Sequence, residues 1–166
     1  MESKLNELVS IVIVTSGTND YLIDCLRSIK EQAYLNTQTI VIDNSLNPQF
    51  SQCIRQDFPW AQICEEPENL FYSKSLNKGI SLSQGEFILC LNDDLVLDKN
   101  FIQENLKIFL AKPNVGMVSG KILRKDNLTL DSTGLFLSFW RTAKERGYGL
   151  PDRGQYEKSG FVFGVS

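Results

Sequence analysis

Residues 8–15 read LVSIVIVT, and residues 86–94 read EFILCLNDD. The first stretch is an almost unbroken run of apolar, mostly β-branched side chains, which is the pattern of a strand buried on both faces of a sheet. The second stretch has the same apolar character over residues 86–91 and then turns polar. Because both stretches lack the alternation of a half-exposed strand, they predict a parallel sheet at the centre of an α/β fold.

The segments between these two strands alternate between helical and extended patterns. Tyr21, Leu22, Cys25, Leu26 and Ile29 fall on one stripe of a helix over residues 20–33, with Thr18 or Asn19 as its N-cap. The further predicted elements are a strand at 39–43, a short helix at 50–56, an edge strand at 62–65, and helices at 73–83 and 101–111. This βαβαβ order predicts a mostly parallel sheet with helices on both faces.

The pattern loosens towards the C-terminus. A strand interrupted by Gly120 is predicted over residues 115–123, irregular loops over 131–134 and 146–154, and a last strand over 160–165. Because an apolar strand needs a neighbour to cover its edge, we expect the chain to continue beyond Ser166. Residues 1–166 are then one incomplete domain.

Composition excludes several kinds of chemistry. The chain has 166 residues, 17 basic and 20 acidic side chains, and no histidine. Histidine-based nucleophile systems and histidine-ligated zinc are therefore excluded, and catalysis must use carboxylates, lysine, tyrosine, the backbone or a metal held by oxygen. The net charge of −3 argues against nucleic acid as a partner.

The four cysteines have no metal-binding spacing and predict reduced thiols in a cytoplasmic protein. The first residues lack the pattern of a signal peptide, and no apolar run approaches the roughly 20 residues of a membrane helix. We therefore predict a cytoplasmic location.

Polar residues follow the predicted strands at the edge where open α/β sheets bind ligands. The most informative group is Asn92-Asp93-Asp94, which apolar residues flank on both sides. Because burial of two carboxylates is costly without a compensating charge, this group favours a site for Mg²⁺ or Mn²⁺ with Asp94 as ligand. The alternative is that these acids cap the next helix, a role that suits Asp98 better.

Asp43 ends the strand at 39–43 and can accept a hydrogen bond from a ligand, or equally can form a local turn with Asn44 and Ser45. Lys74 or Lys78 could meet a phosphate, although exposed helix lysines are more often simply solvated.

Neither a G-x-G-x-x-G loop nor a Walker loop is present, so dinucleotide-binding enzymes and P-loop NTPases are not supported.

Five stretches in register, VSIVIVT, DYLIDCLRSI, VIDN, NLFYSKSLNKGI and GEFILCLNDD, resemble family 2 glycosyltransferases with a GT-A fold. The resemblance covers essentially the whole chain and implies a Rossmann-like, mostly parallel sheet flanked by helices. The later residues 131–134, 146–149 and 154–156 are similar to the rhamnosyltransferase-like branch that builds bacterial surface polysaccharides.

The resemblance also implies roles for individual residues. Thr15 would lie at the pocket for the nucleotide base, and Asp43 would accept from a ring N–H of the base. Asn77 and Gly79 would belong to a helix start that lines the donor site.

Asn92-Asp93-Asp94 matches the D-x-D-type element of the family, with Asp93 near the ribose or sugar and Asp94 binding the metal that bridges the diphosphate. Asp131 would lie on the acceptor or donor-sugar side.

Three places depart from the family pattern. Asn92 replaces the first acid of the commonest D-x-D element, which removes one charge. Ser16-Gly17 stands where the family usually has an aromatic residue and an asparagine, so no aromatic residue there can stack on the base. Phe71 occupies the place of a frequent glycine and would narrow the donor pocket.

The function implied is inverting transfer of a sugar from a UDP-, dTDP- or GDP-linked donor to a glycan or lipid-linked acceptor. The general base is expected beyond Ser166, so the present chain would lack turnover. A lipid-linked acceptor leaves peripheral attachment to the inner face of the membrane open. The alternative function is a non-catalytic nucleotide-sugar-binding or interaction module; a nucleotidyltransferase is disfavoured because TSGTND is not a glycine-rich basic loop. The oligomeric state is not predicted.

Overall fold

A computed structural model describes residues 6–17 and 20–165, so the predicted N-caps Thr18 and Asn19 lie outside the described residues. Its contacts divide the chain into two compact units, residues 1–103 and 104–166. The unit boundary falls within one helix, α4, which spans Phe101–Ala111 as predicted. Each unit is described by itself below.

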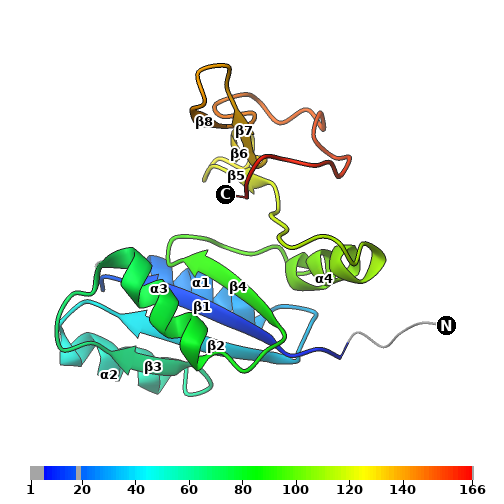
Figure 1. The fold of residues 1–166 in the computed structure, drawn as a ribbon. Coiled ribbons are helices and arrows are strands. Elements are labelled where there is room, and N and C mark those ends of the chain that lie inside the picture. The colour runs from blue at the N-terminus through cyan, green and yellow to red at the C-terminus, as the bar shows by residue number, and fades with distance from the viewer. Residues whose placement is uncertain (1–5, 18–19, 166) are drawn as a thin grey trace. The chain divides into compact units, whose positions relative to one another are not determined.

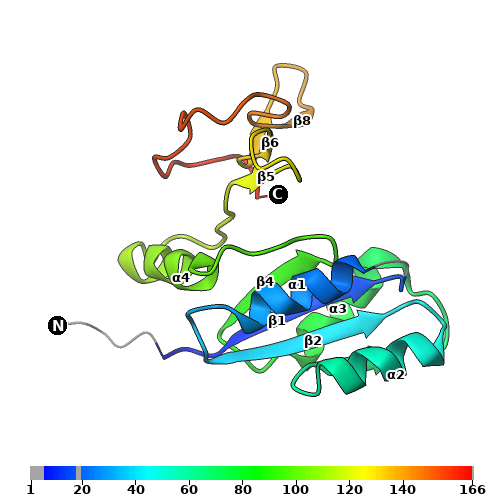
Figure 2. The ribbon, with the colours of Figure 1, turned by 180° about the vertical axis from the view of Figure 1, so that it is seen from behind.

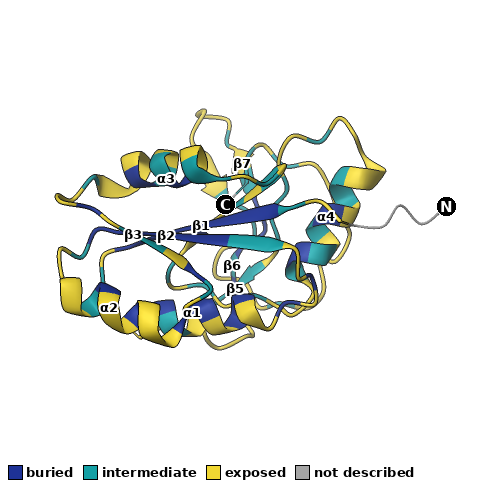
Figure 3. Ribbon diagram, turned by 90° about the horizontal axis from the view of Figure 1, so that it is seen from below, coloured by how far each residue is buried: buried dark blue, intermediate teal, exposed yellow. Residues whose placement is uncertain are grey.

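The first unit is built on a four-stranded parallel sheet in the order β3-β2-β1-β4. The strands are β1 (Val9–Thr15), β2 (Thr37–Asp43), β3 (Gln62–Glu65) and β4 (Phe87–Asn92). Helices α1 (Tyr21–Lys30) and α2 (Pro48–Asp57) cover one face, and α3 (Phe71–Leu82) covers the other (Figures 1 and 3). The predicted α/β fold with a parallel sheet flanked by helices is confirmed.

The sheet is buried most completely at its centre. All seven residues of β1 are buried, as are the last five of β2. Both strands are rich in β-branched residues, which pack well on a pleated surface that is covered from both sides. Seen from behind, α1 lies in front of the sheet and α2 runs below β2 (Figure 2). The apolar runs of β1 and β2 therefore belong to the central strands of the sheet.

Strand β4 differs from its prediction as a fully buried strand. It pairs only with β1 and lies at the edge of the sheet. Its side chains alternate, so that Ile88 is 41% exposed while Leu91 is buried. An edge strand pairs with a neighbouring strand on one side only. The apolar sequence of β4 does not show that one of its sides lacks such a neighbour.

The second unit contains two small antiparallel sheets. Strand β5 (Ile122–Leu123) pairs with β6 (Leu130–Ser132), and β7 (Leu135–Leu137) pairs with β8 (Ala143–Glu145). The predicted strand at 115–123 is wrong except for its last two residues. The predicted loop at 131–134 overlaps the end of β6, whereas the loop at 146–154 contains no strand, only an isolated bridge between Pro151 and Thr129.

The predicted last strand, residues 160–165, is also wrong within the described residues. Its chain makes only an isolated bridge, between Gly164 and Leu135. Ion pairs also link segments of this unit, since Lys121 Nζ lies 2.6 Å from Asp152 Oδ2 and 2.7 Å from Glu157 Oε1. In the described part of the chain, no helix is both long and apolar enough to cross a bilayer.

Candidate functional site

The carboxyl ends of β1, β2 and β4 finish level with one another. In the parallel register, Thr15 lies opposite Asp43 and Val14 lies opposite Asn92. This is the edge at which open α/β sheets bind ligands. A pocket of about 330 Å³ opens here, and we call it the sheet-edge pocket. It is lined by Val14, Thr15, Ser16, Asn44, Asn69, Phe71, Tyr72, Asn92, Asp93 and Asp94.

Thr15 links β1 to the acidic group after β4. Its side chain is 2% exposed, and its hydroxyl donates to Asp93 Oδ2 over 2.7 Å. The same Thr15 oxygen accepts from the Gly17 N–H at 3.1 Å. Thr15 is therefore placed to hold Asp93 in one orientation.

Gly17 is required by the turn that follows β1. Its φ is +72°, and a Cβ there would lie 2.2 Å from the Ser45 Cβ. Only glycine satisfies both conditions without displacing the β2 turn. The departure from the family pattern at this position thus has a steric cause in this chain.

The two carboxylates are more accessible than the sequence predicts. Asp93 is half-buried, and Asp94 and Asn92 are exposed. The expectation that burial forces a compensating cation is therefore wrong for Asp94, and the Thr15 hydrogen bond offsets part of the cost for Asp93. The capping alternative does not describe these acids either, since it is Asp98 that accepts from the Asn100 N–H just before α4.

The negative charge of this pair reaches a thiol on α1. Cys25 Sγ lies 3.9 Å from the Asn92 carbonyl oxygen. Burial, followed by the charges of Asp93 and Asp94, raises the pKa of the Cys25 thiol to about 12. The two carboxylates of the sheet-edge pocket therefore add to the effect of burial on this thiol.

The carboxylates of Asp93 and Asp94 fit a hard divalent ion that also takes phosphate oxygens as ligands. Nowhere in residues 6–17 and 20–165 do three or more His, Cys, Asp or Glu side chains gather to hold a metal. Asp93 and Asp94 together offer two oxygen-donor carboxylates at an accessible pocket. Mg²⁺ commonly binds through one or two carboxylates, with substrate phosphates and water completing its shell.

The start of α3 forms the opposite wall of the pocket. Asn44 holds this helix to the sheet, since its Nδ2 donates to Ser75 Oγ over 2.8 Å and its Oδ1 accepts from the Leu70 N–H at 3.4 Å. Phe71 is 76% exposed and Tyr72 is 48% exposed. Sequence reasoning missed Asn44, Asn69 and Tyr72 as lining residues. The signal for Asn44 was its position directly after β2.

Phe71 has a left-handed backbone with φ of +57°, and its N–H donates to Asn69 Oδ1 at 2.8 Å. A bulky side chain rarely adopts this conformation, which explains why a glycine suits the position.

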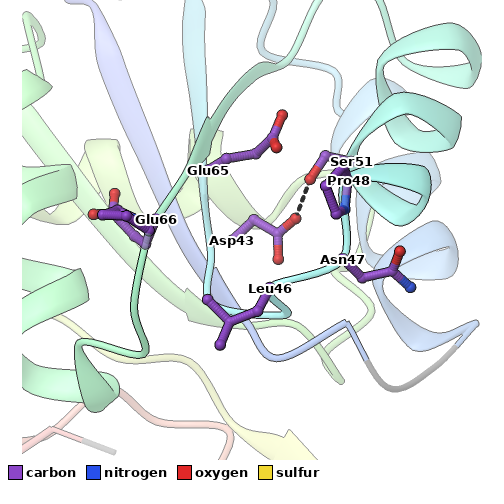
Figure 4. A pocket seen from close by; sticks show the side chains of 8 residues that line it. Asp43, Leu46, Asn47, Pro48, Ser51, Glu65 and Glu66 are labelled. Carbon is purple, nitrogen blue, oxygen red and sulfur yellow. Dashed lines mark hydrogen bonds between the residues drawn. The ribbon is translucent and has the colours of Figure 1, made fainter.

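Asp43 faces a second pocket, of about 410 Å³ (Figure 4). The carboxylate is 2% exposed, and its Oδ1 accepts from the Ser45 N–H at 2.7 Å. The Ser51 hydroxyl donates to its Oδ2. The local turn that the sequence left open is therefore present. Leu46, Asn47, Pro48, Glu65, Glu66 and Pro67 complete this lining.

The helix residues predicted at the donor site lie elsewhere. Asn77 and Gly79 fall midway along α3 rather than at its start, and neither is among the lining residues of the two pockets. Gly79 is buried, and a Cβ there would lie 2.2 Å from Val12 Cγ1. Lys78 pairs with the buried Glu66, with Nζ 2.6 Å from Oε1.

Asp131 belongs to the second unit, where it lies on β6. Its Oδ1 is 3.4 Å from Arg124 Nε, and the Arg124 guanidinium in turn lies 4.6 Å from the centre of the Tyr148 ring. Asp131 is therefore part of an exposed ion pair in this unit.

A parallel sheet with carboxylates and amides at its carboxyl edge defines an α/β protein that binds a ligand at that edge. Within this class, the chain belongs to Glycosyl transferase family 2, whose sequence pattern matches residues 10–163. The predicted family is confirmed.

Among curated proteins, glycosyltransferase GlyG of Streptococcus pneumoniae serotype 4 is 25% identical over 103 residues. Those residues are 60% of this chain and 34% of GlyG. The chain thus spans about a third of the length of this relative.

Two solved structures share the fold. One is the mannosyltransferase PcManGT from Pyrobaculum calidifontis in complex with GDP-Man and Mn²⁺, with a TM-score of 0.62 and 23% identity over 73% of this chain and 37% of that one. The other is S. aureus TarS 1–349 in complex with UDP-GlcNAc, with a TM-score of 0.57 and 16% identity over 72% of this chain and 37% of that one. Both confirm the GT-A-type architecture.

Proposed function

We propose that the chain binds the nucleotide-sugar donor of a metal-dependent, inverting glycosyltransferase. Residues 1–166 act as the donor-binding part of a longer enzyme. The observation that carries this proposal is the Thr15–Asp93 hydrogen bond, because it fixes a carboxylate of the acidic group in the same pocket as the polar ends of β1 and β2.

Within this site, Asp94 would hold Mg²⁺ or Mn²⁺, and Asp93 would accept from a hydroxyl of the ribose or the sugar. The exposure of Asp94 suits a ligand that shares the ion with a diphosphate. A metal held there would supply positive charge to offset the charge of a nucleotide diphosphate. Thr15 keeps Asp93 oriented, and Asn92 would contribute an uncharged oxygen beside the two acids.

Asp43 would receive the base in the neighbouring pocket. Its oxygens already accept from Ser45 and Ser51, but a carboxylate has about four acceptor sites, so a ring N–H can still bind. Asn77 and Gly79 would act indirectly, by setting how closely α3 packs on the sheet. Asp131 stays a proposed residue of the acceptor or donor-sugar side.

The substrate is proposed from resemblance and fold. The similar structures hold GDP-Man and UDP-GlcNAc, which supports a nucleotide-linked hexose as donor. Similarity of residues 131–156 to the rhamnosyltransferase-like branch favours a dTDP-linked rhamnose. The sugar would be transferred to a glycan or lipid-linked acceptor in bacterial surface polysaccharide synthesis. We place the general base of this transfer beyond Ser166.

The test is a calorimetric titration of the chain with UDP, dTDP and GDP, each with and without Mn²⁺. We expect Mn²⁺ to tighten binding of at least one nucleotide, and Asp94→Asn to abolish the Mn²⁺ effect. Lys125→Gln, on an exposed residue of the second unit outside both pockets, is the matched control and should bind normally. Absence of binding to all three nucleotides would refute the proposal.

Binding without any metal effect would instead support the alternative, a non-catalytic nucleotide-sugar-binding module. The absence of turnover in this chain would not decide between the two, because the acceptor-side residues would be outside it.

A further inference from the structure

Strands β7 and β8 form a hairpin in the second unit (Figure 1). The turn between them carries two adjacent aromatic residues, Phe139 and Trp140. Phe139 is 92% exposed and Trp140 is 82% exposed. Their rings contact each other edge to face, with centroids 5.4 Å apart. Hairpin tips ordinarily carry Gly, Asn or Asp, so a pair of large apolar rings at this place calls for a function.

The turn that presents the two rings is well ordered by hydrogen bonds. The Ser138 N–H donates to the Thr142 carbonyl at 2.9 Å, and the Arg141 N–H donates to the Ser138 carbonyl at 2.9 Å. The hydroxyls of Ser138 and Thr142 lie 2.6 Å apart. Arg141 closes the turn with φ of +58°. The rings are thus held outward by a defined backbone.

The exposed charges beside the tip are positive. Arg141 and Lys144 are both exposed, whereas the acid of the hairpin, Glu145, is half-buried and accepts from the Ser132 hydroxyl. Lys144 faces Phe136 across the strand pair, and Phe136 is 44% exposed. The hairpin is therefore an apolar, basic projection on a chain whose net charge is −3.

We propose that this hairpin tip docks on the surface of an anionic phospholipid bilayer, with Phe139 and Trp140 among the headgroups and Arg141 and Lys144 facing anionic lipids. Trp and other aromatic rings favour the interfacial zone of a bilayer, and basic side chains gain from the negative surface potential. Charge complementarity selects this partner, because a zwitterionic surface would leave both cations without partners. The inference does not depend on donor binding at the sheet-edge pocket.

The first experiment measures flotation of the whole chain with vesicles. Vesicles of phosphatidylcholine with about one quarter phosphatidylglycerol should bind it, and pure phosphatidylcholine should bind it far more weakly. Phe139→Ser/Trp140→Ser should lower the partition coefficient at least about tenfold, since it removes both interfacial anchors. Phe161→Ser is the matched control, because Phe161 is 90% exposed outside the hairpin and its loss should leave binding unchanged.

The second experiment uses the fluorescence of Trp140. The chain has two tryptophans, so Trp60→Phe leaves Trp140 as the single reporter. Anionic vesicles should shift its emission to the blue and protect it from an aqueous quencher. An unchanged spectrum in the presence of vesicles would overturn the proposal.

The third experiment separates charge from hydrophobicity. Arg141→Gln/Lys144→Gln should weaken binding to anionic vesicles by about fivefold per charge and reduce its salt dependence. Lys74→Gln should have no such effect. If Phe139→Ser/Trp140→Ser leaves vesicle binding intact, or instead abolishes self-association in the absence of lipid, the tip is not a lipid anchor. Nucleotide titration of the same variants is a separate readout, which should match that of the unaltered chain.

Discussion

At the scale of single residues, the adjacent Phe71 and Tyr72 have similar side chains but different backbone conformations. Phe71 has φ of +57°, whereas Tyr72 lies within the right-handed α3 helix. We predict that Phe71→Gly raises the free energy of unfolding by about 1 kcal/mol, because glycine adopts the left-handed region freely. The melting temperature should rise by about 2–4 °C.

The matched variant is Tyr72→Gly, which should lower the melting temperature because glycine is unfavourable inside a helix. Thermal unfolding followed by circular dichroism measures both changes. An equal fall in melting temperature for Phe71→Gly and Tyr72→Gly would show that packing contacts of Phe71 outweigh its backbone strain.

The buried thiol beside the acidic group gives a second residue-level prediction. With the pKa of Cys25 at about 12, only about one Cys25 thiol in ten thousand is ionised at pH 8. Because the thiolate is the reactive form, iodoacetamide should modify the exposed Cys53 rapidly and Cys25 hardly at all. Peptide mass spectrometry over time, in native buffer and in urea, measures both rates. Cys25 labelling as fast as Cys53 labelling in native buffer would contradict the described burial.

Much of the site was predictable at this scale because polar residues that end apolar strands meet at one edge of a parallel sheet. This argument placed Thr15, Asp93 and Asp94 in one pocket. It did not reveal that Asp43 is held by Ser45 and Ser51, since a carboxylate that binds a ligand and one that closes a turn have the same sequence context. The family resemblance, not this argument, placed Gly79 at the donor site, and the structure shows Gly79 packed closely against Val12.

At the scale of elements, the distance between α3 and β1 depends on that glycine. An added Cβ at Gly79 would lie 2.2 Å from Val12 Cγ1, which forces the helix or the valine to move. We predict that Gly79→Ala destabilises the fold by about 1–3 kcal/mol, although alanine alone favours a helix by about 1 kcal/mol. Urea unfolding measures the difference.

A double-mutant cycle tests the cause of this loss. Val12→Ala removes the methyl group that the new Cβ would meet, so Gly79→Ala should cost much less in that background. Gly116→Ala is the control, because its added Cβ would have no atom within 4 Å and stability should change little. Additive losses in the cycle would exclude the Val12 contact as the cause.

The elements of the first unit were predicted well, and the three-residue strands of the second unit were not. The predicted bounds of β3 and α4 match the structure, and β1 and β2 differ by one or two residues. Strands β6, β7 and β8 have three residues each, too few for an alternating pattern to emerge. Their pairing depends on turns such as that at Ser138–Thr142, which apolar periodicity does not report.

At the scale of the whole molecule, the two units differ in how much apolar core they bury. Among the described residues, the buried apolar side chains come almost entirely from residues 1–103, and only Leu106 and Leu130 come from the second unit. Burial of apolar area is the main favourable term in folding. The first unit therefore holds most of the stability and all of the residues that line the sheet-edge pocket.

We predict that residues 1–112, which include the complete α4 helix, fold without the rest of the second unit. Limited proteolysis of the whole chain should cut first within residues 112–165 and leave this fragment, because the short sheets there cover little core. The isolated fragment should keep a cooperative thermal transition and the nucleotide affinity of the whole chain, measured by calorimetry. Its matched partner, residues 113–166 alone, should show no cooperative transition. A fragment 1–112 that is unfolded would show that the second unit supplies core contacts on which the parallel sheet depends.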